Sequence, residues 1–90
     1  MNFIILERQK TYKERIKDFI EYMMYEIENT GRPNELMRVS EYLRKAESNR
    51  DIHEYMIAND GSTIKINIAL LPEKELVRVD IRFPDTIEIK

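Results

Sequence analysis

Few side chains in this sequence have the types and spacing that catalysis or metal binding requires. The 90 residues include no Cys and a single histidine, His53. A structural zinc or iron–sulfur site would lack ligands, and a nucleophilic triad would have to depend on that one imidazole ring. The two glycines, Gly31 and Gly61, are too far apart to form a phosphate-binding loop. We therefore expect no catalytic residue, no metal and no cofactor, with His53 as a general base only if the chain cleaves RNA.

Acidic residues are numerous, and their arrangement on one segment is more informative than their number. At about 100° per residue, the helical pattern of residues 11–29 places a set of carboxylates and one tyrosine within a narrow arc: Glu14, Asp18, Glu21, Tyr25 and Glu28. Carboxylates attract a basic partner, and tyrosine is enriched at the centres of interfaces. This arc predicts a docking surface for a protein with a basic patch. A solvated helix face is the simpler interpretation of the same pattern.

The charges of this segment also run against the helix dipole. Basic residues crowd its beginning and acidic residues its end, which is unfavourable by about 0.3–1 kcal/mol for each well-placed charge. The basic group is Arg8, Lys10, Lys13, Arg15 and Lys17, and the acidic group is Glu21, Glu26 and Glu28. A departure from a local rule without evident gain in stability is a possible sign of function.

A second candidate surface lies in the C-terminal half of the chain. Lys65, Arg78 and Arg82 project from the polar face of predicted strands, together with Asn67 and Asp80. An open face of this kind could contact phosphate groups or an acidic partner. The formal charge of −2 and the pI near 5.5 make nucleic acid the less favoured partner, because such binding depends on excess Lys and Arg.

Two predicted helices carry the first surface. Residues 11–29 show apolar side chains at helical spacing, and Gly31 and Pro33 end that helix. Asn34 can cap a second helix that runs to Ser48, so the short link makes an antiparallel helical hairpin. Before them, residues 3–6 are consecutive apolar side chains that predict a short buried strand.

From residue 51 onward the apolar residues recur at every second position, as in strands. Asn59-Asp60-Gly61 predicts a hairpin turn between strands 52–58 and 62–71, since Gly and Asn or Asp tolerate positive φ. A third strand covers 77–83, and 87–89 could form a short edge strand after Pro84. The predicted core collects apolar residues from these elements: Ile16, Phe19, Met23, Leu43, Ile66, Ile68, Val79 and Ile81.

These elements predict one α+β domain over residues 1–90, with a helical hairpin packed on one face of a mainly antiparallel sheet of 3–5 strands. The order is β-α-α-β-β-β(-β). The alternative is a winged helix-turn-helix, in which 51–58 forms a third helix. The order resembles that of the bacterial RNase toxins of the RelE/ParE type in topology alone, which implies RNA binding or cleavage through the sheet face as an alternative function.

The favoured function is a non-catalytic protein-interaction module, such as a small bacterial or phage-type inhibitor, an adaptor or a homodimeric subunit. The absence of Cys is compatible with the reducing cytoplasm, and we expect the chain there. Its apolar runs are too short for a membrane helix, and its first residues lack the pattern of an export signal, so we expect no membrane association.

Overall fold

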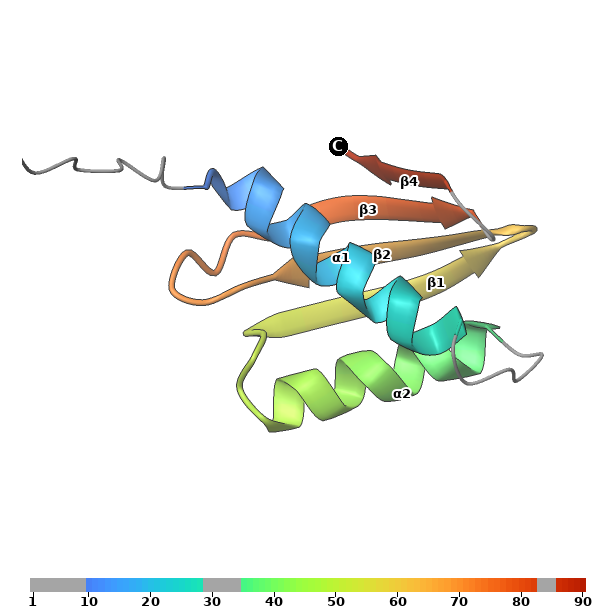
Figure 1. Cartoon of the computed structure of the whole chain (residues 1–90), viewed down its shortest axis with the longest axis horizontal. Coiled ribbons are helices and arrows are strands. Elements are labelled where there is room, and N and C mark those ends of the chain that lie inside the picture. The colour runs from blue at the N-terminus through green and yellow to red at the C-terminus, as the bar shows by residue number, and fades with distance from the viewer. Residues whose placement is uncertain (1–9, 29–34, 83–85) are drawn as a thin grey trace, which may run out of the picture.

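The computed structural model describes residues 10–28, 35–82 and 86–90 (Figure 1). Two helices, α1 (Tyr12–Glu28) and α2 (Glu35–Ser48), precede four strands, β1 (Glu54–Asp60), β2 (Thr63–Ala69), β3 (Val77–Arg82) and β4 (Thr86–Ile89). The predicted α+β class is confirmed, with two helices followed by an open antiparallel sheet. The strand predicted at 3–6, the link 31–34 and the Asn34 cap lie outside the described residues.

The start of α1 is fixed by the residue before it. The backbone N–H of Glu14 donates to the Thr11 hydroxyl, and the Thr11 N–H donates to the Glu14 carboxylate, each at 3.2 Å. This reciprocal capping box satisfies two donors that a helix N-terminus leaves without partners. At the other end, the Arg38 guanidinium of α2 donates to the carbonyl of Ile27. The two helices are thus joined where α1 ends.

Helix α2 leads into the sheet through a left-handed residue. Arg50 has φ of 63°, the Asp51 N–H donates to the Ala46 carbonyl at 2.9 Å, and the Arg50 N–H donates to the Glu47 carbonyl at 3.0 Å. These are the two hydrogen bonds of a Schellman motif, with arginine at the position where glycine is usual. The helix therefore stops sharply, and the next residues enter the sheet.

The four strands form a simple antiparallel meander in the order β1-β2-β3-β4. Asp60 pairs with Thr63, so the first hairpin turns through Gly61 and Ser62, and Gly61 has φ of +62°. The turn therefore begins two residues later than Asn59-Asp60-Gly61 predicted. Because β1 is a strand across most of 51–58, the winged-helix alternative, which needs a helix there, is wrong.

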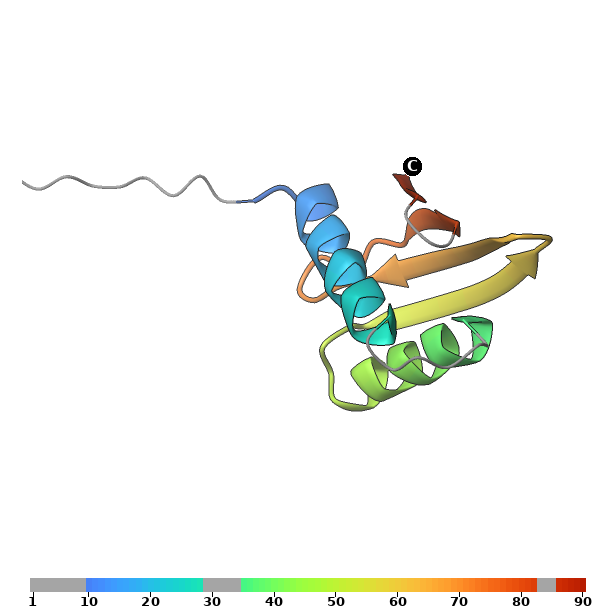
Figure 2. The same ribbon diagram turned by 45° about the vertical axis from the view of Figure 1, so that its right-hand side comes forward.

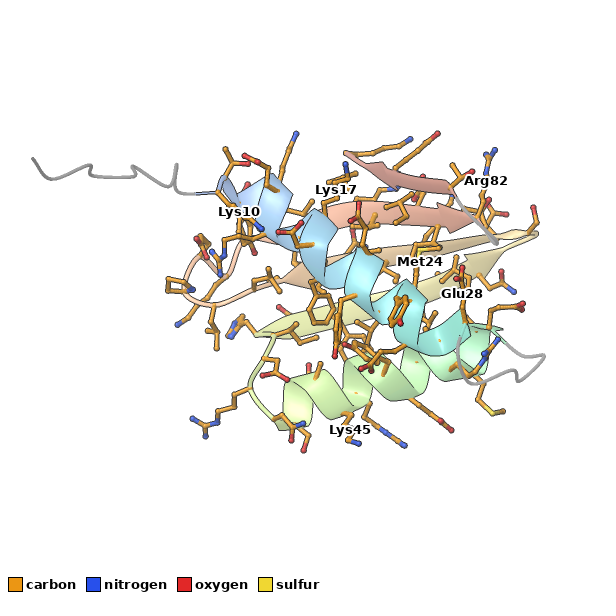
Figure 3. All side chains as sticks on the ribbon, viewed as in Figure 1. Lys10, Lys17, Met24, Glu28, Lys45 and Arg82 are labelled. Atoms are coloured by element: carbon orange, nitrogen blue, oxygen red, sulfur yellow. The ribbon has the colours of Figure 1, made fainter. Side chains whose placement is uncertain are left out.

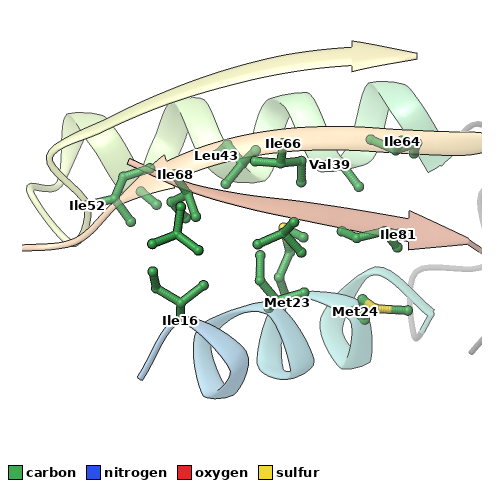
Figure 4. Close-up of a cluster of buried hydrophobic side chains, with 14 of the residues drawn as sticks. Ile16, Met23, Met24, Val39, Leu43, Ile52, Ile64, Ile66, Ile68 and Ile81 are labelled. Carbon is green, nitrogen blue, oxygen red and sulfur yellow. The ribbon is translucent and has the colours of Figure 1, made fainter. Parts of the chain in front are cut away.

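Both helices cover one face of the sheet, and the core lies between them and β2 and β3 (Figures 1, 2 and 4). Seven of the predicted core residues are buried, but Phe19 is only partly buried because it lies on the side of α1 that faces α2. Met24 also belongs to the core and is 6% exposed. Fully burying a side chain of this size is worth about 1.5–3 kcal/mol.

The first turn of α1 is tied to the loop between β2 and β3. The Tyr12 hydroxyl accepts from the Leu70 N–H and donates to the Glu75 carbonyl, each at 2.7 Å. Arg15 donates to the Leu71 carbonyl at 2.6 Å and pairs with the Glu73 carboxylate. The N-terminal part of α1 therefore has a structural role.

Candidate functional site

The predicted docking arc of α1 divides into two unlike halves. In the N-terminal half its carboxylates already have partners. Glu14 belongs to the capping box, Asp18 pairs with Lys10, and the Glu21 carboxylate lies 3.8 Å from the Lys17 ammonium. Exposed pairs of this kind are worth about 0–1 kcal/mol, so they contribute little to stability. They do cancel much of the negative charge that the sequence pattern implied there.

The C-terminal half of α1 keeps its negative charge and displays two tyrosines. Tyr22 is 58% exposed and Tyr25 is 65% exposed, one turn apart. The exposed carboxylates of Glu26 and Glu28 flank them, and the last turn contains no basic residue. The backbone carbonyls at a helix C-terminus carry partial negative charge, and that of Ile27 accepts a hydrogen bond from Arg38. We call the set Tyr22, Tyr25, Glu26 and Glu28 the tyrosine surface.

The tyrosine surface continues onto α2 through a row of rings. The Phe19 and Tyr42 centroids are 5.8 Å apart, with the rings tilted by 62° in an edge-to-face contact. Tyr22 also lies on this side of α1, and we call Phe19, Tyr22 and Tyr42 the aromatic seam. Figure 3 shows the side chains of both helices, and it labels Glu28 near the opposite end of α1 from Lys10. With Tyr25, these residues include three of the chain's five tyrosines and one of its three phenylalanines.

Glu26 links the rings electrostatically. A hydrogen bond with the Glu26 carboxylate, reinforced by its negative charge, raises the pKa of the Tyr22 hydroxyl. Burial raises the pKa of Tyr42, and the negative charge of Glu26 adds to that effect. One carboxylate therefore acts on a phenol from each helix. A sequence signal existed for Tyr22 and Glu26, which are four residues apart on one helix, but none could have placed Tyr42 beside them.

The open face of the sheet carries the second predicted surface, and its charges alternate. Along β2 and β3, Lys65 is opposite Asp80 and Asn67 is opposite Arg78. Arg78 Nε lies 3.3 Å from the Asp80 carboxylate, Lys90 Nζ lies 3.6 Å from it, and Lys65 Nζ lies 3.0 Å from the Asp60 carboxylate. Arg82 Nε donates to the Thr63 hydroxyl at 3.2 Å. Three of these four cations therefore lie against carboxylates of their own face.

Asp80 is the residue around which this network forms. The sequence placed it on a polar, solvated face, but it is 9% exposed because the cationic side chains cover it. Burial raises the pKa of its carboxyl, yet the hydrogen bond from Arg78 and the charges of Arg78, Lys90 and Lys65 outweigh that effect and leave the pKa below its ordinary value. The carboxylate is thus held charged and paired.

Two shallow hollows flank the edge strand β1. One of about 500 Å³ lies on the open sheet face against Met56, Lys65, Asn67 and Arg78. The other, of about 560 Å³, lies between α2 and β1 and includes Leu36, Met37, Arg44 and Ile57. Met37 and Met56 are 58% and 52% exposed. Sequence analysis did not identify these hollows, because they form between elements far apart in the chain.

His53, the one candidate general base, is exposed just before β1, where its backbone N–H donates to the Ala69 carbonyl at 2.8 Å. Within residues 10–28, 35–82 and 86–90, no three side chains of His, Cys, Asp or Glu are grouped so as to hold a metal ion. Neither α1 nor α2, the two described helices, has the length and apolar character that a membrane crossing requires.

Comparison of the chain with protein-family models, with curated proteins and with solved structures finds no match. The candidate surfaces must therefore be compared on their own geometry. The tyrosine surface combines exposed rings with carboxylates, while the open sheet face combines cations with the carboxylates that neutralise them.

Proposed function

We propose that this chain is a non-catalytic protein-interaction module that binds a basic surface of a cytoplasmic partner through the tyrosine surface of α1. The observation that carries the proposal is the pair of exposed tyrosines set among carboxylates in a helical segment without a basic residue in its last turn. An adaptor, a small inhibitor and a subunit of a larger assembly would all use such a surface.

The energetics of protein interfaces support this choice. Tyrosine buries a large, rigid area on binding and still satisfies its hydroxyl, so it is enriched among the residues that dominate binding energy. Tyr22 and Tyr25 are the two aromatic side chains most exposed in the described part of the chain. Neither ring packs in the core, so the apolar area of both rings stays in contact with water. A partner that covers both rings would recover that apolar area.

The charge pattern supports a basic partner. Glu26 and Glu28 follow the tyrosines on the same exposed side of the helix, and their carboxylates add to the negative end of its dipole. Such a surface steers a basic partner and raises its association rate, an effect that salt screens over about 8–10 Å. Binding should therefore weaken as ionic strength rises.

The test is photo-crosslinking in cells from two matched positions of the full chain. A benzophenone amino acid replaces Tyr25 in one variant and Met56 in the other, because both side chains are exposed but lie on opposite sides of the molecule. We expect position 25 to yield one dominant protein adduct, with the crosslinked peptide on a basic surface of that protein. Position 56 should yield no such adduct.

Two controls make the outcome decisive. Adding Glu26→Lys and Glu28→Lys to the position 25 variant should abolish the adduct, while thermal unfolding shows that the domain remains folded. An adduct from position 56 alone, with protein or with RNA, would instead assign the working surface to the open sheet face. Absence of an adduct at position 25, or an adduct insensitive to the charge reversal, would overturn the proposal.

A further inference from the structure

The aromatic seam has a chemistry more specific than that of a generally acidic helix face. Its rings come from two helices, and a carboxylate lies beside them. Phe19 and Tyr42 meet edge to face at 5.8 Å, and the exposed side chains of Tyr22 and Glu26 lie one turn apart on α1. Ring faces and a carboxylate at one place are the two groups that attract a planar cation.

We infer that the aromatic seam receives an arginine side chain of the protein partner, with Glu26 as its carboxylate acceptor. This inference rests on the proposed function and specifies its partner chemistry. The guanidinium would stack on the exposed ring of Tyr22 while its N–H groups donate to Glu26. Arginine fits better than lysine because its planar fork stacks on aromatic rings and matches a carboxylate with two parallel hydrogen bonds.

Glu26 has the capacity for this contact. A carboxylate offers about four acceptor positions. Glu26 is exposed, so these positions face solvent or a partner. Tyr22 lies one helical turn before Glu26 and is 58% exposed, so a guanidinium that stacks on its ring can reach the carboxylate.

The charge around the seam favours a cation over any other occupant. Negative charge from Glu26 acts on both Tyr22 and Tyr42, and Asp51 adds to it at Tyr42. The Arg38 side chain, which comes from the adjacent turn of α2, is directed to the carbonyl of Ile27 at the end of α1. An aliphatic or acidic side chain would gain nothing from the carboxylate beside the rings.

The probe is an oligo-arginine peptide, titrated at low salt into the full chain with NMR observation of the aromatic ring signals. An oligo-citrulline peptide of equal length is the matched control, because citrulline keeps the planar shape and loses the charge. We expect oligo-arginine to shift the Tyr22 and Tyr42 ring signals, oligo-lysine to bind more weakly, and oligo-citrulline to leave those signals unchanged.

Substitutions then assign the contact. Glu26→Gln should weaken oligo-arginine binding by about tenfold, since a hydrogen bond to a charged carboxylate is roughly twice as strong as one to a neutral amide. Tyr22→Leu should weaken it by about two- to fivefold, as expected for an exposed cation–π contact, whereas Tyr22→Phe should retain the stacking. Glu47→Gln, an equal change of charge on the exposed part of α2, should alter binding by less than about twofold. Thermal unfolding of each variant confirms that the fold persists.

These outcomes separate this inference from the proposed function. If Glu47→Gln weakens binding as much as Glu26→Gln, the attraction is diffuse and the arginine site is overturned, while an adduct from position 25 would still establish the docking surface. Equal binding of oligo-lysine, or shifts confined to residues away from the seam, would overturn the inference in the same way. If the seam binds oligo-arginine but position 25 gives no adduct, the proposed function fails instead.

Discussion

The tyrosine surface of α1 and the open face of the sheet are both exposed and rich in charge, yet they differ in where the opposite charge lies. On the sheet, Arg78 and Lys90 lie within 4 Å of the Asp80 carboxylate, and Lys65 lies as close to Asp60. At the end of α1, the residues beside Glu26 and Glu28 are tyrosines and apolar side chains. The comparison teaches that the number of charged residues does not distinguish the two surfaces. What distinguishes them is whether those charges are already paired within the surface or are left for a partner to pair.

The two arrangements follow from the geometry of each element. Antiparallel pairing fixes which residue lies opposite each strand position, so the backbone of Lys65 is directly across from that of Asp80. On a helix the neighbours are four residues apart. Lys17 finds Glu21 in this way, whereas the same spacing further along joins Glu21 to Tyr25 and Tyr22 to Glu26. At this end of α1 the i,i+4 partner of Glu26 is therefore a tyrosine, and the Arg38 guanidinium of α2 donates to the Ile27 carbonyl.

The largest expected effect tests whether the two faces of the sheet differ as described. Ile66 is fully buried on the face toward the helices, while Met56 is 52% exposed on the other. Ile66→Ala should lower the free energy of unfolding by about 2–5 kcal/mol, and Met56→Ala should change it by less than about 0.5 kcal/mol. Chemical denaturation measures both. Similar losses for the two variants would mean that the open face is covered.

The next prediction tests whether the N-terminal half of α1 is structural. Tyr12→Phe removes the acceptor of the Leu70 N–H and the donor to the Glu75 carbonyl, so it should cost about 1–3 kcal/mol of unfolding free energy. Tyr25→Phe, the same change on the tyrosine surface, should cost less than about 0.5 kcal/mol. A stable Tyr12→Phe variant would contradict the division of the helix into two roles.

A third prediction applies to the partner that crosslinking identifies. Tyr25→Ala should weaken binding by about 1–2 kcal/mol if the ring is a central anchor, and the loss should appear as faster dissociation. Reversal of Glu26 and Glu28 to Lys should mainly slow association, and the loss should shrink at high salt. Surface plasmon resonance separates the two rates. The matched control changes Lys65, Arg78 and Arg82 together to Glu, and a partner lost only with that control would reverse our choice of surface.

A smaller effect tests whether the cations of the sheet are neutralised. Asp80→Asn should release Arg78 and Lys90 and increase the salt concentration needed to elute the protein from heparin at neutral pH. Because the folded pKa of Asp80 lies below the ordinary value of 3.8, its contribution to stability is present above that pH and is lost as the pH falls through the folded pKa. Unchanged elution of Asp80→Asn would show that the pairing is unimportant.

The smallest effect is spectroscopic and sharpens the description of the aromatic seam. Tyr22 and Tyr42 should ionise later than pH 10.0, the ordinary value, in an absorbance titration of the phenols. Their stabilising contribution is present below that pH and is lost as the pH rises through the folded pKa values. Glu26→Gln should bring both titrations closer to the ordinary value, while Glu47→Gln should leave them in place. Two unshifted tyrosines in the native protein would remove Glu26 from the seam.

Sequence patterns were sufficient to identify the described helices and strands and to assign the α+β class. The period of the apolar residues identified both helices and the strands, because burial on one side of a regular element repeats at the period of that element. Even so, the first hairpin turn came two residues later than Asn59-Asp60-Gly61 indicated. Register decided this, since pairing of Asp60 with Thr63 leaves Gly61 and Ser62 for the turn.

What the sequence by itself determined is which residues share a face of one helix or one strand, and it placed Tyr25 and Glu28 on a face of α1 that the core does not use. Only the tertiary structure decided which faces meet. It brought Tyr42 of α2 to Phe19, gathered three cations around Asp80 and buried Met24 in the core. The physical reason is that local periodicity fixes the direction of a side chain within its element, whereas its neighbours in space depend on how separate elements pack.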